Sequence, residues 1–167
     1  MILFLLTLLA FSCDKESVSS YVNTTTPSPL QIPSLFESLI LNPIIPPNNP
    51  QTEEGVLLGR KLFYDPLLSA DNTQACASCH NPVNAFTDSN QFSEGIDGFF
   101  GNRNAMPLFN LAWNYEDLFF WDGRESGLEN QAFEPINNPI EMHTSWPEVA
   151  EKLSQNSEYP PLFEAAF

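Results

Sequence analysis

The chain has 167 residues, which is the length of one ordinary domain. It is strongly acidic, with 21 Asp and Glu against 6 Lys and Arg and a formal net charge of -15 at pH 7. A field of this sign repels phosphate backbones and anionic lipid surfaces. The composition therefore excludes nucleic acid as an expected partner.

The chain begins with a segment that is typical of export. Residues 1–11 form an apolar run with the length of a signal-peptide core, too short for a bilayer span, which needs about 20 residues. Ser12 and Cys13 follow, and over residues 1–13 the pattern looks like a bacterial lipobox with Cys13 as the lipidated residue. The alternative is a plain secretory signal with a chance cysteine. Both interpretations place the mature chain in the periplasm or cell envelope.

Residues 14–50 are rich in Ser, Thr and Pro and contain few residues to bury. This composition predicts a solvated tether without regular structure. We expect the folded body to span residues 51–167.

The first helix of the body is predicted over residues 52–64. Thr52 can cap its first turn, and the acidic pair that follows suits the positive end of a helix dipole. Val56, Gly59, Leu62 and Phe63 form an apolar stripe at helical spacing, and the Asp-Pro pair at 65–66 ends the pattern.

Further along the chain, residues 126–133 predict a weaker helix and residues 145–156 a strong one. The strong one opens with a capping box of Ser145 and Glu148, with Pro147 in its first turn. The last nine residues start another apolar helix, and we expect the body to be truncated there. No segment shows sustained alternation of period two, so the predicted class is all-α, with short helices and long loops.

The stretch CASCH, residues 76–80, carries the clearest chemical signal. A structural zinc site takes four ligands, and the chain has few others to offer. A thioredoxin-like redox pair gives no role to the adjacent histidine. In c-type haem attachment, Cys76 and Cys79 form thioethers with the haem vinyls and His80 becomes the proximal iron ligand. We therefore predict a cytochrome c-like domain around one covalently bound haem c.

The sixth iron ligand then decides the function. If Met106 or Met142 binds the iron, the chain is a mono-haem electron-transfer cytochrome c. If the distal side is open and carries an acid–base group, the chain is a peroxidase.

Three stretches carry a family resemblance: LGRKLFYDPLLSADNTQACASCHNPVNAFTD, then GNRNAMPLFNLAWN, then FFWDGRESGLENQAFEPINNPIEM. They resemble the N-terminal domain of bacterial di-haem cytochrome c peroxidases and their methylamine-utilisation relatives. The resemblance implies that this domain holds the peroxide-reducing haem. Its reaction would convert hydrogen peroxide to water with electrons from a small donor protein, a cytochrome c or a cupredoxin.

The resemblance also assigns roles to individual residues. It implies that Glu141 moves the proton between the two peroxide oxygens, and that desolvation raises its pKa. Gln131 becomes a hydrogen bonder of the pocket, Pro135 shapes access to the iron, and Trp121 relays electrons between haems. The remaining two assignments are Arg124, paired with a haem propionate or with Asp122, and Asn104 as a calcium ligand.

The sequence departs from the family pattern in two places. Many members hold a histidine on the resting peroxidatic iron from the loop that corresponds to QFSEGIDGFFGN, which has none here. We therefore expect an open, five-coordinate iron and regard His143 as a surface residue. A second C-x-x-C-H is also absent, so we expect the partner domain with the second haem to lie outside this chain. The resemblance leaves open oxidation of a protein substrate in place of peroxide removal.

Overall fold

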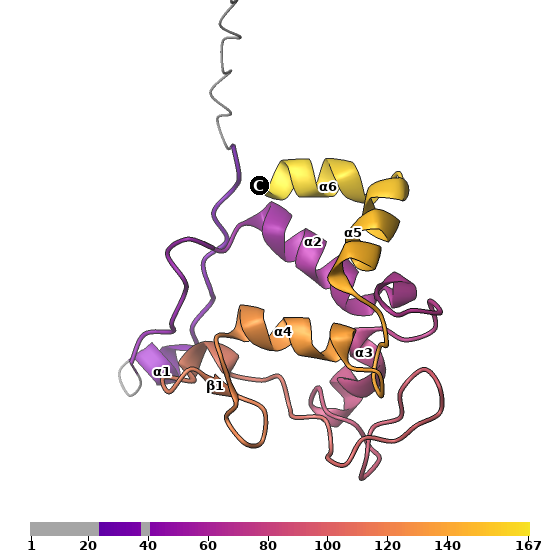
Figure 1. Cartoon of the computed structure of the whole chain (residues 1–167). Coiled ribbons are helices and arrows are strands. Elements are labelled where there is room, and N and C mark those ends of the chain that lie inside the picture. The colour runs from indigo at the N-terminus through magenta and orange to yellow at the C-terminus, as the bar shows by residue number, and fades with distance from the viewer. Residues whose placement is uncertain (1–23, 38–40) are drawn as a thin grey trace, which may run out of the picture.

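The structure is a computed structural model, and it describes residues 24–37 and 41–167. The predicted signal segment with Cys13 and the first part of the predicted tether lie outside these residues. Within the described ranges the chain forms short helices joined by long loops (Figure 1). The helix-rich character of the predicted all-α class is confirmed.

Helix α2 (Glu53–Tyr64) begins and ends where the sequence predicted. The Thr52 hydroxyl accepts the N–H of Gly55 at 3.0 Å and caps the first turn. At the other end, Asp65 accepts the N–H of Leu67 at 2.8 Å and starts the 3₁₀ helix η1 (Pro66–Leu68). Both boundaries follow from local side-chain chemistry.

The apolar stripe predicted for α2 is wrong in part. Leu58 is the core residue of the helix, at 3% exposure, whereas Val56 is 50% exposed. Helix α6 (Tyr159–Ala166) contacts α2 and decides which side of it is covered. The spacing of apolar residues alone did not identify that side.

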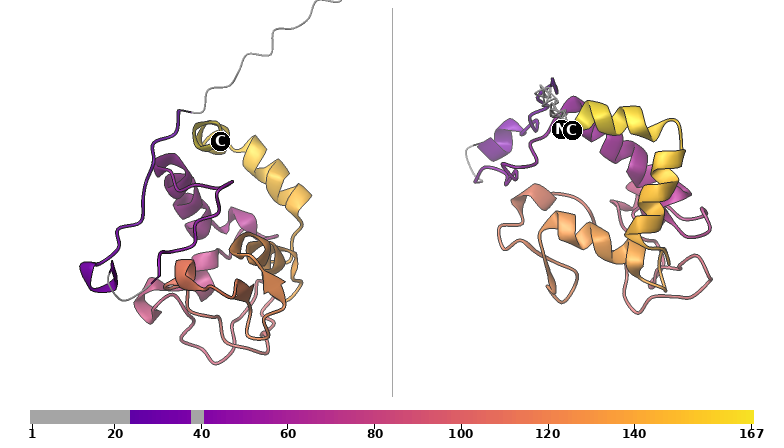
Figure 2. Two further views of the ribbon diagram at one scale, coloured as in Figure 1. Left: turned by 90° about the vertical axis from the view of Figure 1, so that its left-hand side faces the viewer. Right: turned by 45° about the horizontal axis from the view of Figure 1, so that its top comes forward.

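The core lies where α2, α5 (Trp146–Gln155) and α6 meet, and Figures 1 and 2 show the two yellow C-terminal helices beside α2. The predicted capping box is confirmed, since Ser145 N–H donates to Glu148 at 2.9 Å. The C-terminal helix is confirmed as α6. The buried cluster consists of Leu58, Leu68, Ile136, Met142, Val149, Leu153, Tyr159 and Ala166.

Two polar side chains fasten this core. The Tyr159 hydroxyl donates to the Asp65 carboxylate, and burial followed by that hydrogen bond raises the pKa of Tyr159. Lys152 Nζ donates to the carbonyls of Ser69 at 2.6 Å and Ala70 at 3.2 Å. These bonds tie α5 and α6 to the chain that follows α2.

The other half of the body contains little regular structure. Its elements are α3 (Cys76–Cys79), η2 (Pro82–Asn84), η3 (Leu111–Trp113), β1 (Leu118–Phe119), β2 (Glu125–Ser126) and α4 (Leu128–Asn137). The strands pair antiparallel, with Leu118 opposite Ser126. Each strand has only two residues, which explains why the sequence shows no sustained alternation of apolar and polar residues. Helix α4 begins two residues later than predicted and extends four residues further.

The described part of residues 14–50 lies along the body. Thr26 donates to Glu54 through its N–H and its hydroxyl, both at 2.9 Å. Trp113 Nε1 donates to the Leu41 carbonyl at 2.9 Å. One helical turn, α1 (Ser34–Glu37), forms where no regular structure was predicted. Across residues 24–37 and 41–167, no helix has the length and apolarity needed to cross a membrane.

Candidate haem and acid–base site

Helix α3 places the two thiols of CASCH one helical turn apart. Cys76 and Cys79 occupy its first and last positions, three residues apart, and so share one face. Ser78 Oγ accepts the N–H of Ala75 at 3.1 Å and fixes the start of the helix. Both cysteines are free and half-buried, and burial is the main cause that raises the pKa of each thiol.

The imidazole of His80 is fixed through one of its two ring nitrogens. Its Nδ1 lies 3.0 Å from the carbonyl oxygen of Phe86. A carbonyl only accepts hydrogen bonds, so Nδ1 carries the proton and the lone pair of Nε2 is available for iron. Ala85 and Phe86 adopt left-handed backbone angles, with φ of 57° and 58°, and this turn aims the carbonyl at the ring.

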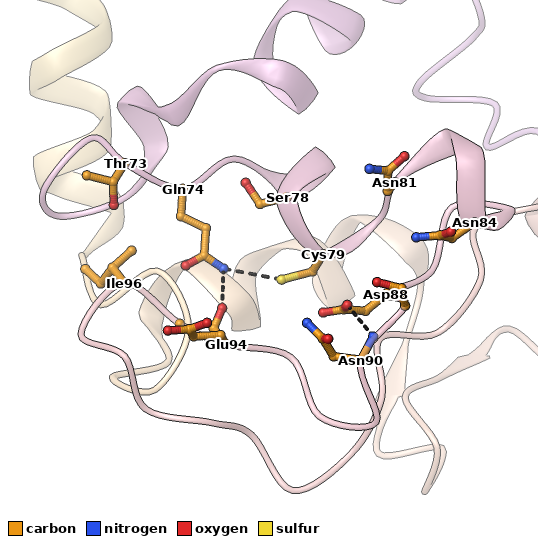
Figure 3. A pocket seen from close by; sticks show the side chains of 12 residues that line it. Thr73, Gln74, Ser78, Cys79, Asn81, Asn84, Asp88, Asn90, Glu94 and Ile96 are labelled. Carbon is orange, nitrogen blue, oxygen red and sulfur yellow. Dashed lines mark hydrogen bonds between the residues drawn. The ribbon is translucent and has the colours of Figure 1, made fainter.

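Gln74 joins the haem-binding motif to the loop of residues 93–101. Its buried amide donates to Cys79 Sγ at 3.3 Å and to the Glu94 carbonyl at 3.1 Å (Figure 3). The motif and this loop therefore form one hydrogen-bonded unit.

Glu141 lies in a turn built by Asn138. The Asn138 side chain accepts the N–H of Ile140 at 3.0 Å through Oδ1 and donates to Glu141 Oε1 at 2.8 Å through Nδ2. Burial raises the pKa of Glu141, as expected, although the bond from Asn138 and the charge of Arg124 oppose the shift. The carboxyl group is thus partly desolvated and fixed on one oxygen.

This turn faces the haem-binding motif. The N–H of Ile96, two residues after Glu94, donates to the Glu141 carbonyl at 3.1 Å. The charge of Glu141 also contributes to the raised pKa of Cys79, after the larger effects of burial and of Asp88. The structure therefore brings Glu141 into the surroundings of Cys79.

Two further predicted residues belong to α4 next to this turn. Gln131 and Pro135 are four residues apart and lie on one face of the helix. Pro135 cannot donate the helical bond to the Gln131 carbonyl. Its own carbonyl accepts the N–H of Met142 at 3.2 Å, which joins α4 to the Glu141 turn.

Trp121, Asn104 and Arg124 form a neighbouring exposed region. Trp121 is 60% exposed, and its indole N–H donates to the Asn104 carbonyl at 2.8 Å. Arg124 pairs with Asp122 at 3.1 Å and stacks on the Phe120 ring. Burial acts to raise the pKa of Asp122, but Arg124 and then Arg103 outweigh it and lower the pKa.

The Asn104 side chain is already occupied by internal hydrogen bonds. Its amide donates to the carbonyls of Asp88 at 3.2 Å and Asn90 at 2.6 Å, and its oxygen accepts the Thr87 hydroxyl at 2.8 Å. In the part of the chain that the structure describes, no group of three or more His, Cys, Asp or Glu residues is placed to hold a metal ion. The predicted calcium ion therefore finds one side-chain oxygen here and no complete site.

The residues around CASCH fit a covalently bound haem. Two free thiols share one helix face, and an imidazole nitrogen with an available lone pair follows them. Large apolar side chains also remain exposed in the loop half, namely Phe86, Phe92, Phe99, Phe100, Phe109, Trp121, Phe133 and Ile140. Apolar side chains of this size pack well against the faces of a porphyrin. A pocket of about 370 Å³ lies beside Cys79 (Figure 3). Its lining is mostly polar, so it does not suit the apolar faces of a porphyrin.

The structure narrows the methionine alternative. The Met142 side chain belongs to the hydrophobic core and is 4% exposed, so it is not placed to bind the iron. Met106 is half-buried and is the methionine that the electron-carrier alternative retains.

Three residues of the site were missed by sequence reasoning. Asn138 precedes a proline, and Asn-Pro is a turn signal that indicates the Glu141 turn. Gly95 lies in the stretch EGIDG, whose glycines also indicate a turn. Gln74 has no local signal, because its role depends on a backbone carbonyl twenty residues away.

Comparison with known proteins agrees with this geometry. A family model described as di-haem cytochrome c peroxidase matches residues 53–167. The chain belongs to this family. The match includes the CASCH motif, the Trp121 region and the Glu141 turn. The resemblance seen in the sequence is confirmed.

Curated relatives carry two kinds of name. The methylamine utilization protein MauG of Methylorubrum extorquens is 43% identical over 73% of this chain and 34% of its own length. Cytochrome c peroxidase Ccp of Escherichia coli is 41% identical over 71% of this chain and 25% of its own length. Cytochrome c551 peroxidase of Pseudomonas aeruginosa is 38% identical over 71% and 34% of the two lengths. The chain thus spans about a third of these relatives or less.

Solved structures support the same fold. A MauG-like protein associated with microbial copper homeostasis matches with a TM-score of 0.73 and 34% identity, over 84% of this chain and 40% of that one. The Y463M variant of the di-haem peroxidase BthA from Burkholderia thailandensis matches with a TM-score of 0.59 and 25% identity, over 77% and 34%.

Proposed function

We propose that this chain is the peroxidatic haem domain of a di-haem peroxidase. In this proposal, the domain binds one haem c through Cys76, Cys79 and His80 and reduces hydrogen peroxide to water. The observation that carries the proposal is the half-buried Glu141, whose pKa is raised by burial and which is tied by hydrogen bonds to the loop that also holds the thiols.

Cleavage of the peroxide O–O bond needs a group that carries a proton between the two oxygens. Bound haem supplies the iron at which peroxide binds and through which electrons arrive. Splitting the O–O bond requires a proton to leave one oxygen and reach the other, while two electrons and two further protons complete two waters. Glu141 accepts the first proton and returns it to the departing oxygen. A carboxyl group with a raised pKa holds a proton more readily than a solvated one.

Neighbouring residues orient this carboxyl group. Asn138 binds Oε1 and leaves the second oxygen for the proton transfer. Gln131 offers an amide on the α4 face that also carries Pro135, and Pro135 limits access to the iron. The hydrogen bond from Asn138 and then the positive charge of Arg124 oppose the rise in the Glu141 pKa and favour its ionised form.

Electrons would enter from outside this chain. The exposed indole of Trp121 suits a relay to a second haem domain, which would receive electrons from a small cytochrome c or cupredoxin. Relatives named as cytochrome c peroxidases support peroxide as the substrate. The apolar N-terminal segment supports export to the periplasm or cell envelope. A calcium ion at Asn104 would need further oxygen ligands, because calcium takes six to eight.

The first test is the visible spectrum of the haem-loaded ferric chain, before and after one equivalent of hydrogen peroxide. The proposal predicts a high-spin spectrum that changes within the mixing time, because an open sixth position lets peroxide reach the iron. A low-spin, methionine-ligated spectrum that peroxide leaves unchanged would overturn the proposal. Loss of that spectrum in Met106→Leu would then establish an electron carrier.

A further inference from the structure

The loop of residues 93–101 is a built hairpin. Gly101 N–H donates to the Ser93 carbonyl at 2.9 Å, and Gly95 N–H donates to the Phe99 carbonyl at 2.8 Å. The tip closes with a bond of 3.1 Å from Gly98 N–H to the Gly95 carbonyl, and Gly98 has a φ of +72°. Three internal backbone hydrogen bonds make the loop rigid enough to hold the residues that it contacts in place.

Gly95, the first glycine of the hairpin, packs directly against the backbone of the turn that carries Glu141. Gly95 is buried, and a Cβ atom there would lie 1.6 Å from the carbonyl oxygen of Ile140 and 2.7 Å from its carbonyl carbon. The obstacle is backbone and not the end of a flexible side chain. Ile96 N–H adds the bond to the Glu141 carbonyl at 3.1 Å. Only glycine allows this approach.

The hairpin tip is fastened on the outside. Asp97 Oδ2 lies 2.7 Å from His143 Nδ1, and the two side chains are 47% and 54% exposed. His143 is therefore exposed, as predicted, but it is also the residue that joins the tip of the hairpin to the end of the Glu141 turn.

The opposite side of the turn is fixed to the core. Met142 fills the hydrophobic cluster, and its carbonyl accepts the N–H of Ala70 at 2.9 Å. Glu141 therefore sits on a strip of backbone held between the core and the hairpin. We expect a shift of the hairpin to move the Glu141 carboxyl group, because the core packing and the Ala70 hydrogen bond fix Met142 on the other side.

We infer that the hairpin of residues 93–101 positions Glu141 for proton transfer, with Gly95 as the positioning residue and the Asp97–His143 pair as its outer clasp. The inference rests on the proposed role of Glu141. The same loop thus links Cys79, through Gln74 and the Glu94 carbonyl, to the turn that carries Glu141.

The test compares two glycines of one hairpin in the haem-loaded chain. Gly95→Ala should lower the rate constant for the reaction with peroxide about 10- to 100-fold, since a shift of about 1 Å can cost that much. Gly101→Ala is the matched control, because its Cβ would meet nothing closer than 3.7 Å. Its rate should stay within about twofold of the parent, on the ordinary tolerance of surface substitutions.

A second readout separates positioning from general damage. In a Glu141→Gln background, Gly95→Ala should have no further effect on the rate, because two changes that act through one group are not additive. An equal loss in both backgrounds, or equal losses for Gly95→Ala and Gly101→Ala, would overturn the inference. A Glu141→Gln chain that keeps the parent rate would instead overturn the proposed function.

The clasp provides a variant that does not disturb packing. Asp97→Asn removes the charge of an exposed pair and should slow the peroxide reaction about two- to fivefold, in line with the modest strength of such pairs. Asp97→Glu keeps the charge and should restore most of the rate. A parent rate in Asp97→Asn would show that the pair takes no part in positioning.

Discussion

The two halves of the body are held together by different forces. Around α2, α5 and α6, apolar side chains are buried, and Val149 and Tyr159 have no exposed surface. In the half that contains residues 80–127, Phe119 is the buried aromatic residue, while long stretches are fixed by side chains such as Asn104 that bind backbone carbonyls. The first half resembles an ordinary helical core, and the second is a scaffold of turns with exposed aromatic rings.

This difference indicates which half of the body depends on haem for its folded structure. Burial of apolar surface contributes about 25 cal/mol per Å², and the helical half obtains this from its own residues. The loop half has aromatic side chains without enough protein to cover them. A haem has two large apolar faces and would be attached through its vinyl groups to Cys76 and Cys79, so it would supply that cover. We therefore expect the helical half to hold its structure without haem and the loop half to depend on it.

Removing the attachment thiols should have the largest effect, and it should separate the behaviour of the two halves. Cys76→Ser with Cys79→Ser should abolish covalent haem and the reaction with peroxide. Amide hydrogen exchange should then become fast across residues 80–127, while α2, α5 and α6 stay protected, because only the loop half loses its apolar cover. Equal protection of both halves in the haem-free chain would contradict the division drawn here.

Loss of the acid–base group should affect chemistry without affecting either half of the fold. Glu141→Gln keeps the hydrogen bond to Asn138 but cannot carry the proton, so the peroxide rate constant should fall about 10²- to 10⁴-fold. The measurement is stopped-flow absorbance at the haem Soret band. The matched control is Glu134→Gln on α4, an exposed carboxylate in the same region, which should react at nearly the parent rate.

The same variant has a pH signature in stability. Burial raises the folded-state pKa of Glu141, so ionising it costs stability as pH rises from its ordinary value of 4.5 through the raised value. The parent should lose stability over that window, and Glu141→Gln should lose less. Urea unfolding at a series of pH values measures the difference, and parallel curves would show that the carboxyl group is solvated.

A substitution in the helical half should change stability and leave chemistry intact. Lys152→Met removes the ammonium that binds the Ser69 and Ala70 carbonyls and should cost about 1.5 to 3 kcal/mol of unfolding free energy. Lys61→Met is the control, since the pair of Lys61 with Glu158 is exposed and its loss should change the unfolding free energy much less. A slower peroxide reaction in Lys152→Met would mean that the two halves are coupled more tightly than described here.

Local signals predicted the ends of elements better than their faces. Thr52, Asp65 and the Ser145–Glu148 box all cap helices as expected, because a cap needs only residues within three or four positions. The predicted apolar stripe was wrong in part, at Val56, since the covered face of α2 depends on α6, about a hundred residues later. Likewise, the prolines of residues 27–50 did not prevent the single turn of α1.

The candidate site shows the same division. CASCH predicted the haem ligands and the family resemblance predicted the role of Glu141. The turn signal of Asn138 was available but unused. The bond from Gln74 to the Glu94 carbonyl, the contact of Gly95 with Ile140 and the Asp97–His143 pair were not predictable, because each joins residues at least twenty positions apart. Met142 was a reasonable iron ligand in the sequence until the structure placed it in the core.

The sequence alone predicted covalent haem attachment, because two thiols and an imidazole in five residues suit the edge of one porphyrin and its iron. It also determined the family and the short helices, which follow from caps and local spacing. Only the tertiary structure decided that the hairpin of residues 93–101 stands between the thiols and Glu141. The physical reason is that a carboxyl pKa and a backbone approach of a few ångströms depend on what packs around a residue, and packing joins segments that are distant in the chain.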